Sequence, residues 1–290
     1  MIGKVELVLD NKALLGEGPC WTNNQLYWVD IKSKQVCIYN PETKSHRKIQ
    51  FEQAVSAIVP RTETEAIIVL EDGFYLLDVE TEELSLLKHV EADIPTNRFN
   101  DGKCDPFGRF WAGTMEKDGK DKQAALYCLD TDGKLSKKLD NVGISNGLDW
   151  SIDQTKFFYI DTLTKKVARF DYEIETGTIS NRTDIIDFEQ EKGMPDGMTI
   201  DAEGMLWIAH WAGSKVSRWN PHTGTKLSEI EVPALNITSC AFGGPDLDEL
   251  YITTASVGMT DDQALQFPLA GGLFKVRTNV RGLRSNHFKG

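Results

Sequence analysis

A residue pattern that the rest of the chain repeats occurs in the stretch Arg98-Phe99-Asn100-Asp101-Gly102-Lys103-Cys104-Asp105-Pro106-Phe107-Gly108-Arg109-Phe110-Trp111-Ala112-Gly113-Thr114-Met115. It begins with polar side chains and a glycine, turns at 105–108, and ends in an aromatic strand with no charge after Arg109. Carboxamide, carboxylate and guanidinium groups placed just before a buried strand are unfavourable unless something binds them. The stretch therefore predicts a β-strand with a binding site beside it.

Short apolar strands, most of them with a central aromatic residue, recur along the chain. Their centres lie at positions 27, 67, 111, 159, 207 and 251, with steps of 40, 44, 48, 48 and 44 residues. Six units of about 45 residues match the size of a four-stranded propeller blade. Within each unit the apolar residues alternate with period two, and Asn, Pro, Thr and Gly mark the turns. The repeats predict an all-β fold, a six-bladed β-propeller.

The two ends of the chain also read as strands. Residues 5–9 alternate like a first strand, and residues 272–276 form the last good one. Pairing these two segments in a shared last blade would remove the open edge of the ring. No Pro/Ser-rich linker divides the sequence, so we expect a single domain over residues 1–290.

Composition excludes several classes of partner. The 290 residues carry a net charge of −12, which argues against nucleic acid and against anionic membranes as partners. No apolar run approaches the ~20 residues of a membrane span, and the N-terminus lacks the long apolar segment of a signal peptide, so we expect a cytoplasmic protein. The five cysteines are scattered without a CxxC pair, which favours reduced thiols. Whether the protein is a monomer or a weak homodimer stays open.

Oxygen-bearing side chains precede the aromatic strands at similar offsets. They are Glu17 (10 residues before Tyr27), Asn100 (11 before Trp111), Asn146 (13 before Tyr159), Asp196 (11 before Trp207), and Thr238 and Ser239 (13 and 12 before Tyr251). If the aromatic strands are innermost, residues at their mouths converge on the propeller axis. One such Asx-Gly pair is usually only a turn, but four polar residues followed by glycine at matching offsets favour a shared site. Residues 54–58 bring no charge and would leave the cavity open.

Three of these residues form a set of oxygen ligands. Glu17 and Asp196 supply carboxylates, and Asn146 supplies an amide oxygen. Two buried carboxylates so close would repel each other and raise a pKa unless a cation lay between them. Such a set suits one hard divalent ion, Ca²⁺, Mg²⁺ or Mn²⁺, and Zn²⁺ remains possible.

At these residues the sequence resembles the family of regucalcin (senescence marker protein), bacterial gluconolactonases and firefly luciferin-regenerating enzyme. The segments that carry the resemblance are 15–19, 98–103, 112–115, 144–151, 195–198 and 238–244. The resemblance implies one axial divalent metal held by Glu17, Asn146 and Asp196, with Asp196 also the catalytic acid/base. It further implies that Arg98 and Asn100 contact the substrate. Ungapped alignment places Asp118 at a third, acidic substrate contact, with Glu116 as the alternative.

The function that the resemblance implies is hydrolysis of sugar lactones such as gluconolactone to aldonic acids. Two alternatives stay open, a related metal-dependent esterase or phosphotriesterase and a non-enzymatic calcium-binding propeller. Arg98 could instead make a structural ion pair. We expect Asp101 and Lys103 to brace the loop, and His210 to be packed or to line the cavity without binding metal.

Overall fold

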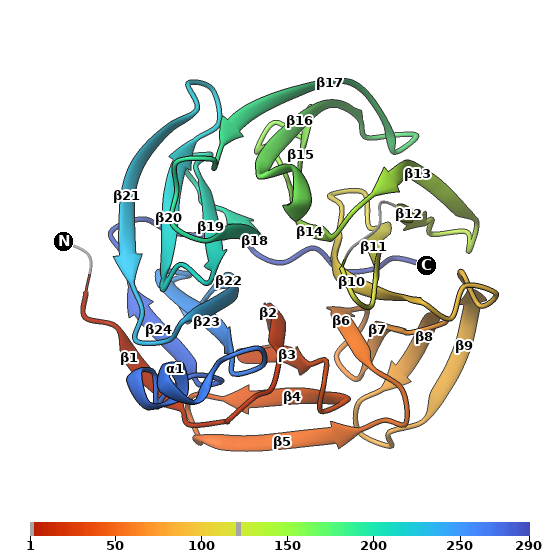
Figure 1. Cartoon of the computed structure of the whole chain (residues 1–290). Coiled ribbons are helices and arrows are strands. Elements are labelled where there is room, and N and C mark those ends of the chain that lie inside the picture. The colour runs from red at the N-terminus through yellow and green to blue at the C-terminus, as the bar shows by residue number, and fades with distance from the viewer. Residues whose placement is uncertain (1–2, 120–122) are drawn as a thin grey trace.

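The computed structural model describes residues 3–119 and 123–290, which form six antiparallel sheets of four strands around a central axis (Figure 1). The predicted six-bladed β-propeller is confirmed. Blades 1 to 3 are each built from four consecutive strands: β2 (Gly16–Thr22), β3 (Gln25–Asp30), β4 (Gln35–Asn40) and β5 (Ser45–Gln50); β6 (Val55–Pro60), β7 (Glu65–Leu70), β8 (Gly73–Asp78) and β9 (Leu84–His89); β10 (Asn97–Cys104), β11 (Phe110–Glu116), β12 (Ala124–Leu129) and β13 (Leu135–Val142).

Blades 4 and 5 follow the same order, and blade 6 combines both ends of the chain. Their strands are β14 (Ser145–Trp150), β15 (Lys156–Asp161), β16 (Lys166–Glu173) and β17 (Thr178–Asp187); β18 (Met194–Ile200), β19 (Leu206–Trp211), β20 (Lys215–Asn220) and β21 (Thr225–Glu231); β22 (Asn236–Gly243), β23 (Glu249–Ala255), β24 (Leu273–Arg277) and β1 (Glu6–Leu9). In blade 6, Glu6 pairs with Lys275 and Leu7 with Phe274. This antiparallel pairing of β1 with β24 brings together the two segments that the sequence expects to close the ring.

The order of strands within each blade differs from the sequence expectation in one respect. The strands beside the axis are β2, β6, β10, β14, β18 and β22, and each contacts its equivalents in the neighbouring blades (Figure 1). The aromatic strands are second in each blade, so placing them innermost was wrong. A second strand is covered by neighbouring blades on both faces, and this makes β7 and β15 almost continuously apolar and buried. The first strands other than β6 carry glycines and polar residues where they crowd together at the axis.

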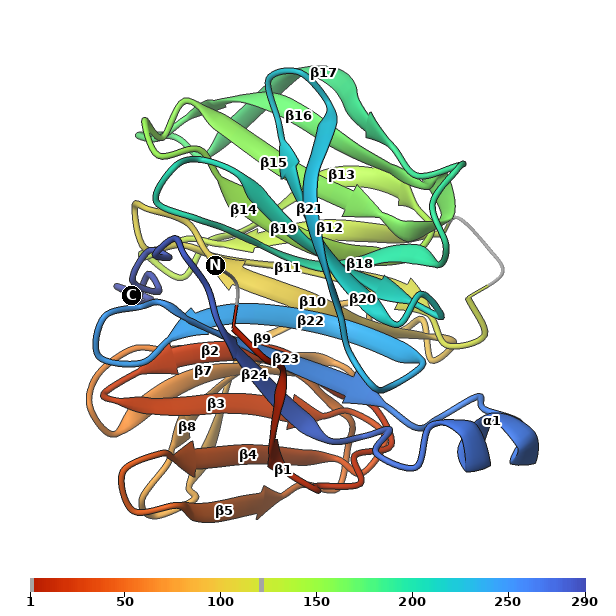
Figure 2. The same cartoon turned by 90° about the vertical axis from the view of Figure 1, so that its left-hand side faces the viewer.

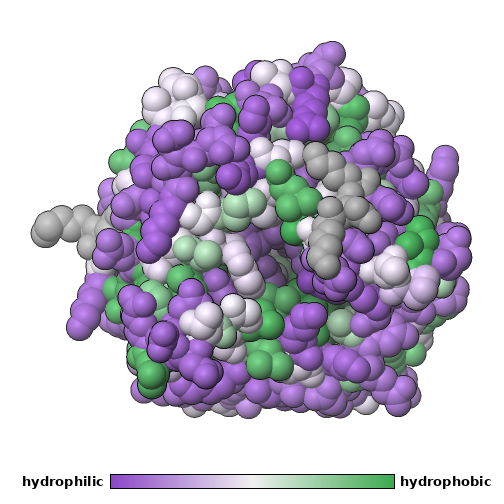
Figure 3. Space-filling view, in the orientation of Figure 1, coloured by the Kyte–Doolittle hydropathy of each residue, from purple (hydrophilic) through white to green (hydrophobic). Residues whose placement is uncertain are grey.

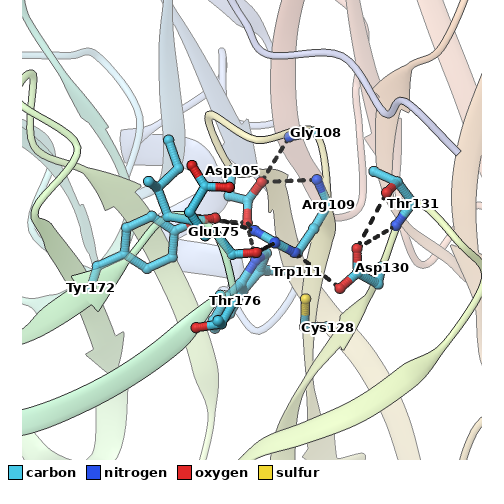
Figure 4. Close-up of polar contacts among 12 residues, drawn as sticks. Asp105, Gly108, Arg109, Trp111, Cys128, Asp130, Thr131, Tyr172, Glu175 and Thr176 are labelled. Carbon is cyan, nitrogen blue, oxygen red and sulfur yellow. Dashed lines mark hydrogen bonds and ion pairs between the residues drawn. The ribbon is translucent and has the colours of Figure 1, made fainter.

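A buried polar cluster joins blade 3 to blade 4 (Figure 4). Asp105 is completely buried, and its Oδ1 accepts hydrogen bonds from the backbone N–H groups of Gly108 and Arg109, both at 2.8 Å. Its Oδ2 accepts from Trp111 Nε1 at 2.9 Å and from the Tyr172 hydroxyl at 2.7 Å, with Arg109 Nη1 at 3.3 Å. We call these four residues, Asp105, Arg109, Trp111 and Tyr172, the Asp105 cluster.

Blade 5 repeats the plan. Asp201 Oδ1 accepts from the backbone N–H groups of Glu203 and Met205, and Oδ2 accepts from Trp207 Nε1 at 2.9 Å and Arg218 Nε at 2.8 Å. In both blades the aspartate stands six residues before the tryptophan of the second strand. A turn carboxylate thus closes the loop between the first two strands and is fully hydrogen-bonded while buried.

Different parts of the chain lie on the two faces of the propeller. The short helix α1 (Asp261–Gln266) projects from one face beside blade 6, and the C-terminal coil lies on the other (Figures 1 and 2). The face that carries α1 is mostly hydrophilic and is hollowed near its centre (Figure 3). The only other helical segment among the described residues is the one-turn 3₁₀ helix η1 (Thr162–Thr164). Within residues 3–119 and 123–290, no helix has the length and apolar character needed to cross a membrane.

Candidate metal site on the propeller axis

The candidate site residues lie at irregularities inside the first strands, not in turns. The pairing register shifts between Glu17 and Cys20 in β2, between Ser145 and Leu148 in β14, and between Pro195 and Met198 in β18. In β10 the shift lies between Phe99 and Gly102. A β-bulge leaves residues unpaired and changes the direction of their side chains. The bulges explain why the polar residue before each glycine faces the axis.

Two of the glycines are required by close approach of neighbouring first strands. A Cβ atom on Gly147 would lie 2.6 Å from the Cβ of Met198 and 2.7 Å from the carbonyl oxygen of Asp196. A Cβ on Gly197 would lie 2.1 Å from Ser239 Oγ. Side-chain atoms cannot occupy such space, so glycine at these positions lets β14, β18 and β22 pack closely. This packing brings Asn146 next to Asp196.

Glu17, Asn146 and Asp196 come together from blades 1, 4 and 5. They are only 5%, 4% and 4% exposed. The Asp196 carboxyl group lies close enough to Glu17 and Asn146 for both side chains to affect its pKa, and Glu17 Oε2 accepts from the backbone N–H of Gly18 at 2.9 Å. Asp196 Oδ1 is buried and has no hydrogen-bond partner among the described residues.

The surroundings of Glu17 and Asp196 disfavour the ionised form of both carboxyl groups. Burial, and then the negative charge of Asp101, raise the pKa of Glu17 from 4.5 to about 8. Burial, followed by Glu17 and Asp101, raises the pKa of Asp196 well above its ordinary value. Two buried carboxylates so close together repel each other, so without a cation the neutral form of at least one of them is favoured.

Arg98 and Asn100 are also buried on the axis, with exposed fractions of 6% each. Arg98 Nη1 donates to the carbonyl of Phe99 at 2.7 Å and to Asn100 Oδ1 at 2.9 Å, while its Nε has no partner. Asn100 Nδ2 donates to the carbonyl of Ser145 at 2.8 Å and lies 3.3 Å from Asn146 Oδ1. Asn100 therefore links Arg98 to a candidate ligand, in addition to any contact with substrate.

The remaining predicted residues differ from this cluster in burial or in their hydrogen-bond partners. Asp118 is exposed in the segment after β11, and Glu116 is half-buried at the end of that strand. His210 is completely buried, with Nε2 2.6 Å from Ser217 Oγ and Nδ1 2.9 Å from the carbonyl of Lys192. Burial lowers the pKa of His210 to about 4. His210 is a packed residue, as the sequence favours. All five cysteines are free thiols.

A second charged group lies directly behind the site. Lys103 Nζ donates to Asp149 Oδ2 at 2.7 Å and to the carbonyl of Met198 at 2.9 Å, and so ties blades 3, 4 and 5 together. Asp101, which is 7% exposed, faces both groups, and burial raises its pKa to about 6 against the opposing effect of Lys103. Sequence reasoning expected Lys103 to brace its own loop. Its partners lie 46 and 95 residues away along the chain. No pattern in the sequence marks Asp149 as the partner of Lys103.

A cavity of about 220 Å³ adjoins this charged group at the end of the axis that carries the C-terminal coil. Asp101, Lys103 and Asp149 line it, together with residues 283–286, whereas Glu17, Asn146 and Asp196 do not. Asn286 Nδ2 donates to the carbonyl of Cys104, and the backbone N–H of Phe288 donates to the carbonyl of Pro60. The C-terminal coil thus covers this end of the axis.

The residues present fit a hard divalent cation. Six charged side chains gather along the axis, four carboxylates and two basic groups: Glu17, Asp101, Asp149, Asp196, Arg98 and Lys103. When all are ionised they leave two negative charges, which one divalent cation neutralises. No three His, Cys, Asp or Glu side chains cluster in a metal-binding arrangement within the described ranges. A site here therefore depends on the amide oxygen of Asn146 as well as on carboxylates.

Comparisons with known proteins identify the family of the chain. The model of the SMP-30/gluconolactonase/LRE-like family matches residues 15–256. Sugar lactone lactonase YvrE of Bacillus subtilis is 43% identical over 286 residues, which are 98% of each chain. A luciferin-regenerating enzyme has a TM-score of 0.94 and 34% identity, covering 99% of this chain and 100% of its own. A calcium-binding protein, regucalcin, from Agrobacterium tumefaciens has a TM-score of 0.95 and 28% identity, with 99% and 97% covered. The chain belongs to the SMP-30/gluconolactonase/LRE-like family.

Proposed function

We propose that this protein hydrolyses sugar lactones to aldonic acids with the help of one divalent cation. The observation that carries the proposal is the pair of neighbouring, buried carboxyl groups of Glu17 and Asp196, with Asp196 Oδ1 left without a partner. The similarity to a sugar lactone lactonase supports the substrate class, and the calcium-binding relative supports a hard cation.

In this proposal Glu17, Asn146 and Asp196 hold the cation, which is Ca²⁺, Mg²⁺, Mn²⁺ or Zn²⁺. Lewis-acid polarisation of the lactone carbonyl is the chemistry that such a cation supplies when bound. A positive charge beside Glu17 and Asp196 would favour the ionised forms of both carboxyl groups. Asp196 is then available as a base.

Asp196 acts as the general acid/base in the proposed reaction. Its carboxylate removes a proton from the attacking water while the water oxygen bonds to the carbonyl carbon. The bond from that carbon to the ring oxygen then breaks, and the proton passes from Asp196 to the ring oxygen, which leaves as a hydroxyl group. A positioned acid/base of this kind contributes roughly 10²–10⁴-fold to a rate.

Arg98 and Asn100 orient the lactone in this proposal. Arg98 Nε is buried without a partner, so a substrate oxygen would satisfy a donor that the protein leaves free. Both polar atoms of Asn100 already have partners in the protein, so besides its contact with the lactone Asn100 holds Arg98 and Asn146 in place. Asp118 is the proposed acidic contact on the exposed side, with Glu116 as the alternative.

The test is gluconolactone hydrolysis by purified protein from which a chelator has removed bound cations. We expect no turnover until Ca²⁺, Mg²⁺, Mn²⁺ or Zn²⁺ is added, and turnover lowered by about 10³-fold in Asp196→Asn with any ion. Glu229→Gln, which removes a charge from the outer strand β21, should behave like the wild type. Binding of a cation without lactone turnover would contradict the proposal, and turnover of an aryl ester or phosphotriester instead would identify the alternative substrate class.

A further inference from the structure

Thr162 contacts the side chain of Asn146 and the backbone next to Asp196. It lies outside β14 and β18, the first strands that carry these two candidate ligands. It is the first residue of η1, directly after β15, and is 7% exposed. Its hydroxyl group donates to the carbonyl oxygen of Pro195 at 2.8 Å and accepts from Asn146 Nδ2 at 2.9 Å. Pro195 is the residue before Asp196, so a single hydroxyl group contacts the Asn146 side chain and the backbone that presents Asp196.

The direction of these hydrogen bonds is fixed by chemistry. The Thr162 hydroxyl has one proton, and the Pro195 carbonyl can only accept, so the proton must point to Pro195. The hydroxyl oxygen is then an acceptor toward Asn146, and only the amide nitrogen of Asn146 can donate to it. The amide nitrogen must therefore face Thr162, and the amide oxygen must point to the opposite side.

Arg98 fixes the same orientation from the other end. Its guanidinium group can only donate, so it requires the oxygen of Asn100. The amide nitrogen of Asn100 then points to the Ser145 carbonyl and to Asn146 Oδ1. The hydrogen-bond chain Arg98–Asn100–Asn146–Thr162–Pro195 consequently has a single polarity across blades 3, 4 and 5.

Thr162 is itself held firmly. The Asp161 carboxylate caps η1 by accepting from the backbone N–H of Leu163 at 3.3 Å. The same carboxylate accepts from the backbone N–H groups of Gly143 and Ile144, both at 3.0 Å, just before β14. These bonds tie the turn that carries Thr162 to the strand that carries Asn146, so the two side chains keep their relative position.

We propose that Thr162 is a positioning residue that keeps the oxygen of Asn146, and not its nitrogen, available to a divalent cation. This inference rests on the proposed function, because it takes Glu17, Asn146 and Asp196 as the ligands. A flipped amide would direct an NH₂ group, which has no lone pair to share, toward the cation. Partners of this kind, one step removed from a metal, typically change metal affinity about 10–100-fold when removed.

The experiment measures the dissociation constant of Mn²⁺ by titration calorimetry on the chelator-stripped protein. Thr162→Val keeps the shape but removes the hydroxyl group, and we expect Mn²⁺ to bind about 10-fold more weakly or worse. Thr162→Ser keeps the hydroxyl group and should bind like the wild type. Thr162→Ala provides the same comparison if the valine variant does not fold. A role in stability alone would lower the melting temperature of the metal-free protein and leave the dissociation constant unchanged.

A second background tests whether the effect passes through the Asn146 amide. In Asn146→Asp there is no amide to orient, so adding Thr162→Val should weaken Mn²⁺ binding much less than in the wild type. Equal affinity of Thr162→Val and wild type, or loss of affinity in Thr162→Ser, overturns the positioning role but leaves the proposed function standing. A wild-type protein that binds no divalent cation overturns both.

Discussion

Asp105 and Asp196 are both buried carboxylates near an arginine, but the surroundings of their oxygen atoms differ sharply. Asp105 accepts from two backbone N–H groups, an indole, a phenol and a guanidinium group, and both of its oxygen atoms are used (Figure 4). Asp196 lies beside a second carboxyl group, that of Glu17, and leaves Oδ1 without a partner. Arg109 likewise contacts Asp130 and a carbonyl group, whereas Arg98 Nε has no partner.

The difference separates a buried carboxylate with a structural role, Asp105, from one with a proposed functional role, Asp196. Buried polar groups are normally hydrogen-bonded, so an unpartnered one needs a separate explanation. The Asp105 cluster neutralises its own charge, needs no further partner and joins two blades. The axial site leaves negative charge unbalanced and a donor and an acceptor unpaired, which is the condition expected of a site completed by a cation and a substrate.

The largest expected effect is on activity at the axial site. Asp196→Asn should lower kcat/KM for a sugar lactone by about 10³-fold, because it removes the proposed acid/base. The same change removes one of two conflicting carboxyl groups, so the metal-free variant should melt at the wild-type temperature or above it. Steady-state kinetics measure the loss of activity, and thermal unfolding in chelator measures the stability of the metal-free variant. A strong fall in melting temperature would show that Asp196 is instead structural.

The Asp105 cluster should respond in the opposite way. Asp105→Asn removes the charge that balances Arg109 and forces an NH₂ group toward donors, which should lower the free energy of unfolding by about 3–5 kcal/mol. The folded fraction should keep wild-type activity and Mn²⁺ affinity. Denaturant titration measures the loss of stability, and Asp201→Asn is the matched variant in blade 5. Loss of Mn²⁺ binding by the folded Asp105→Asn protein would break the comparison.

Removal of the cation should affect stability through the axial site alone. Cation present at 100 times its dissociation constant stabilises the folded protein by about 2.7 kcal/mol, and a chelator removes that contribution. The wild type should therefore melt at a lower temperature in chelator. Asp105→Asn, which starts from a lower stability, should lose the same amount of free energy of unfolding. Asp196→Asn should show no such shift, and a full shift in that variant would place the cation elsewhere.

The smallest effect is expected for charges exposed to solvent. Hydrogen bonds from Lys215 and Lys226 lower the pKa of Glu229 from 4.5 to about 2. Because the folded pKa lies below the unfolded one, the stabilisation is present above pH 4.5 and is lost as the pH falls toward 2. Glu229 is 41% exposed, so solvent screening limits this contribution to about 0.5 kcal/mol at neutral pH. Denaturant titration of Glu229→Gln and wild type should give a difference at pH 7 that becomes smaller at pH 2.5.

Much of the fold was predictable because the blades repeat. The spacing of the central residues of the apolar strands predicts six blades, and the alternation in residues 5–9 and 272–276 matches the strands β1 and β24 that share blade 6. The error concerned the strand beside the axis. Hydrophobicity identifies a strand that is buried on both faces, which here is the second strand. The first strand was hidden by the glycines and polar residues that its position on the axis requires.

The candidate site was predictable in its residue types and only partly in its connections. Glu17, Asn146 and Asp196 share a position in the repeat, and this symmetry brings them together on the axis. Thr162 stands outside the repeat, in a one-turn helix after β15, and nothing in the sequence marks it. The Asp105 cluster was hidden for a similar reason, since Tyr172 lies 67 residues away from the carboxylate that it contacts.

The sequence by itself determined the number of blades and the oxygen-rich character of the site, because both are repeated local patterns. Only the tertiary structure decided which polar residues stay unpaired, which way the Asn146 amide faces, and that Lys103 pairs with Asp149. The physical reason is that these properties depend on atoms brought together by the packing of blades 3, 4 and 5. Whether a buried oxygen atom finds a donor depends on neighbours that the order of residues does not specify.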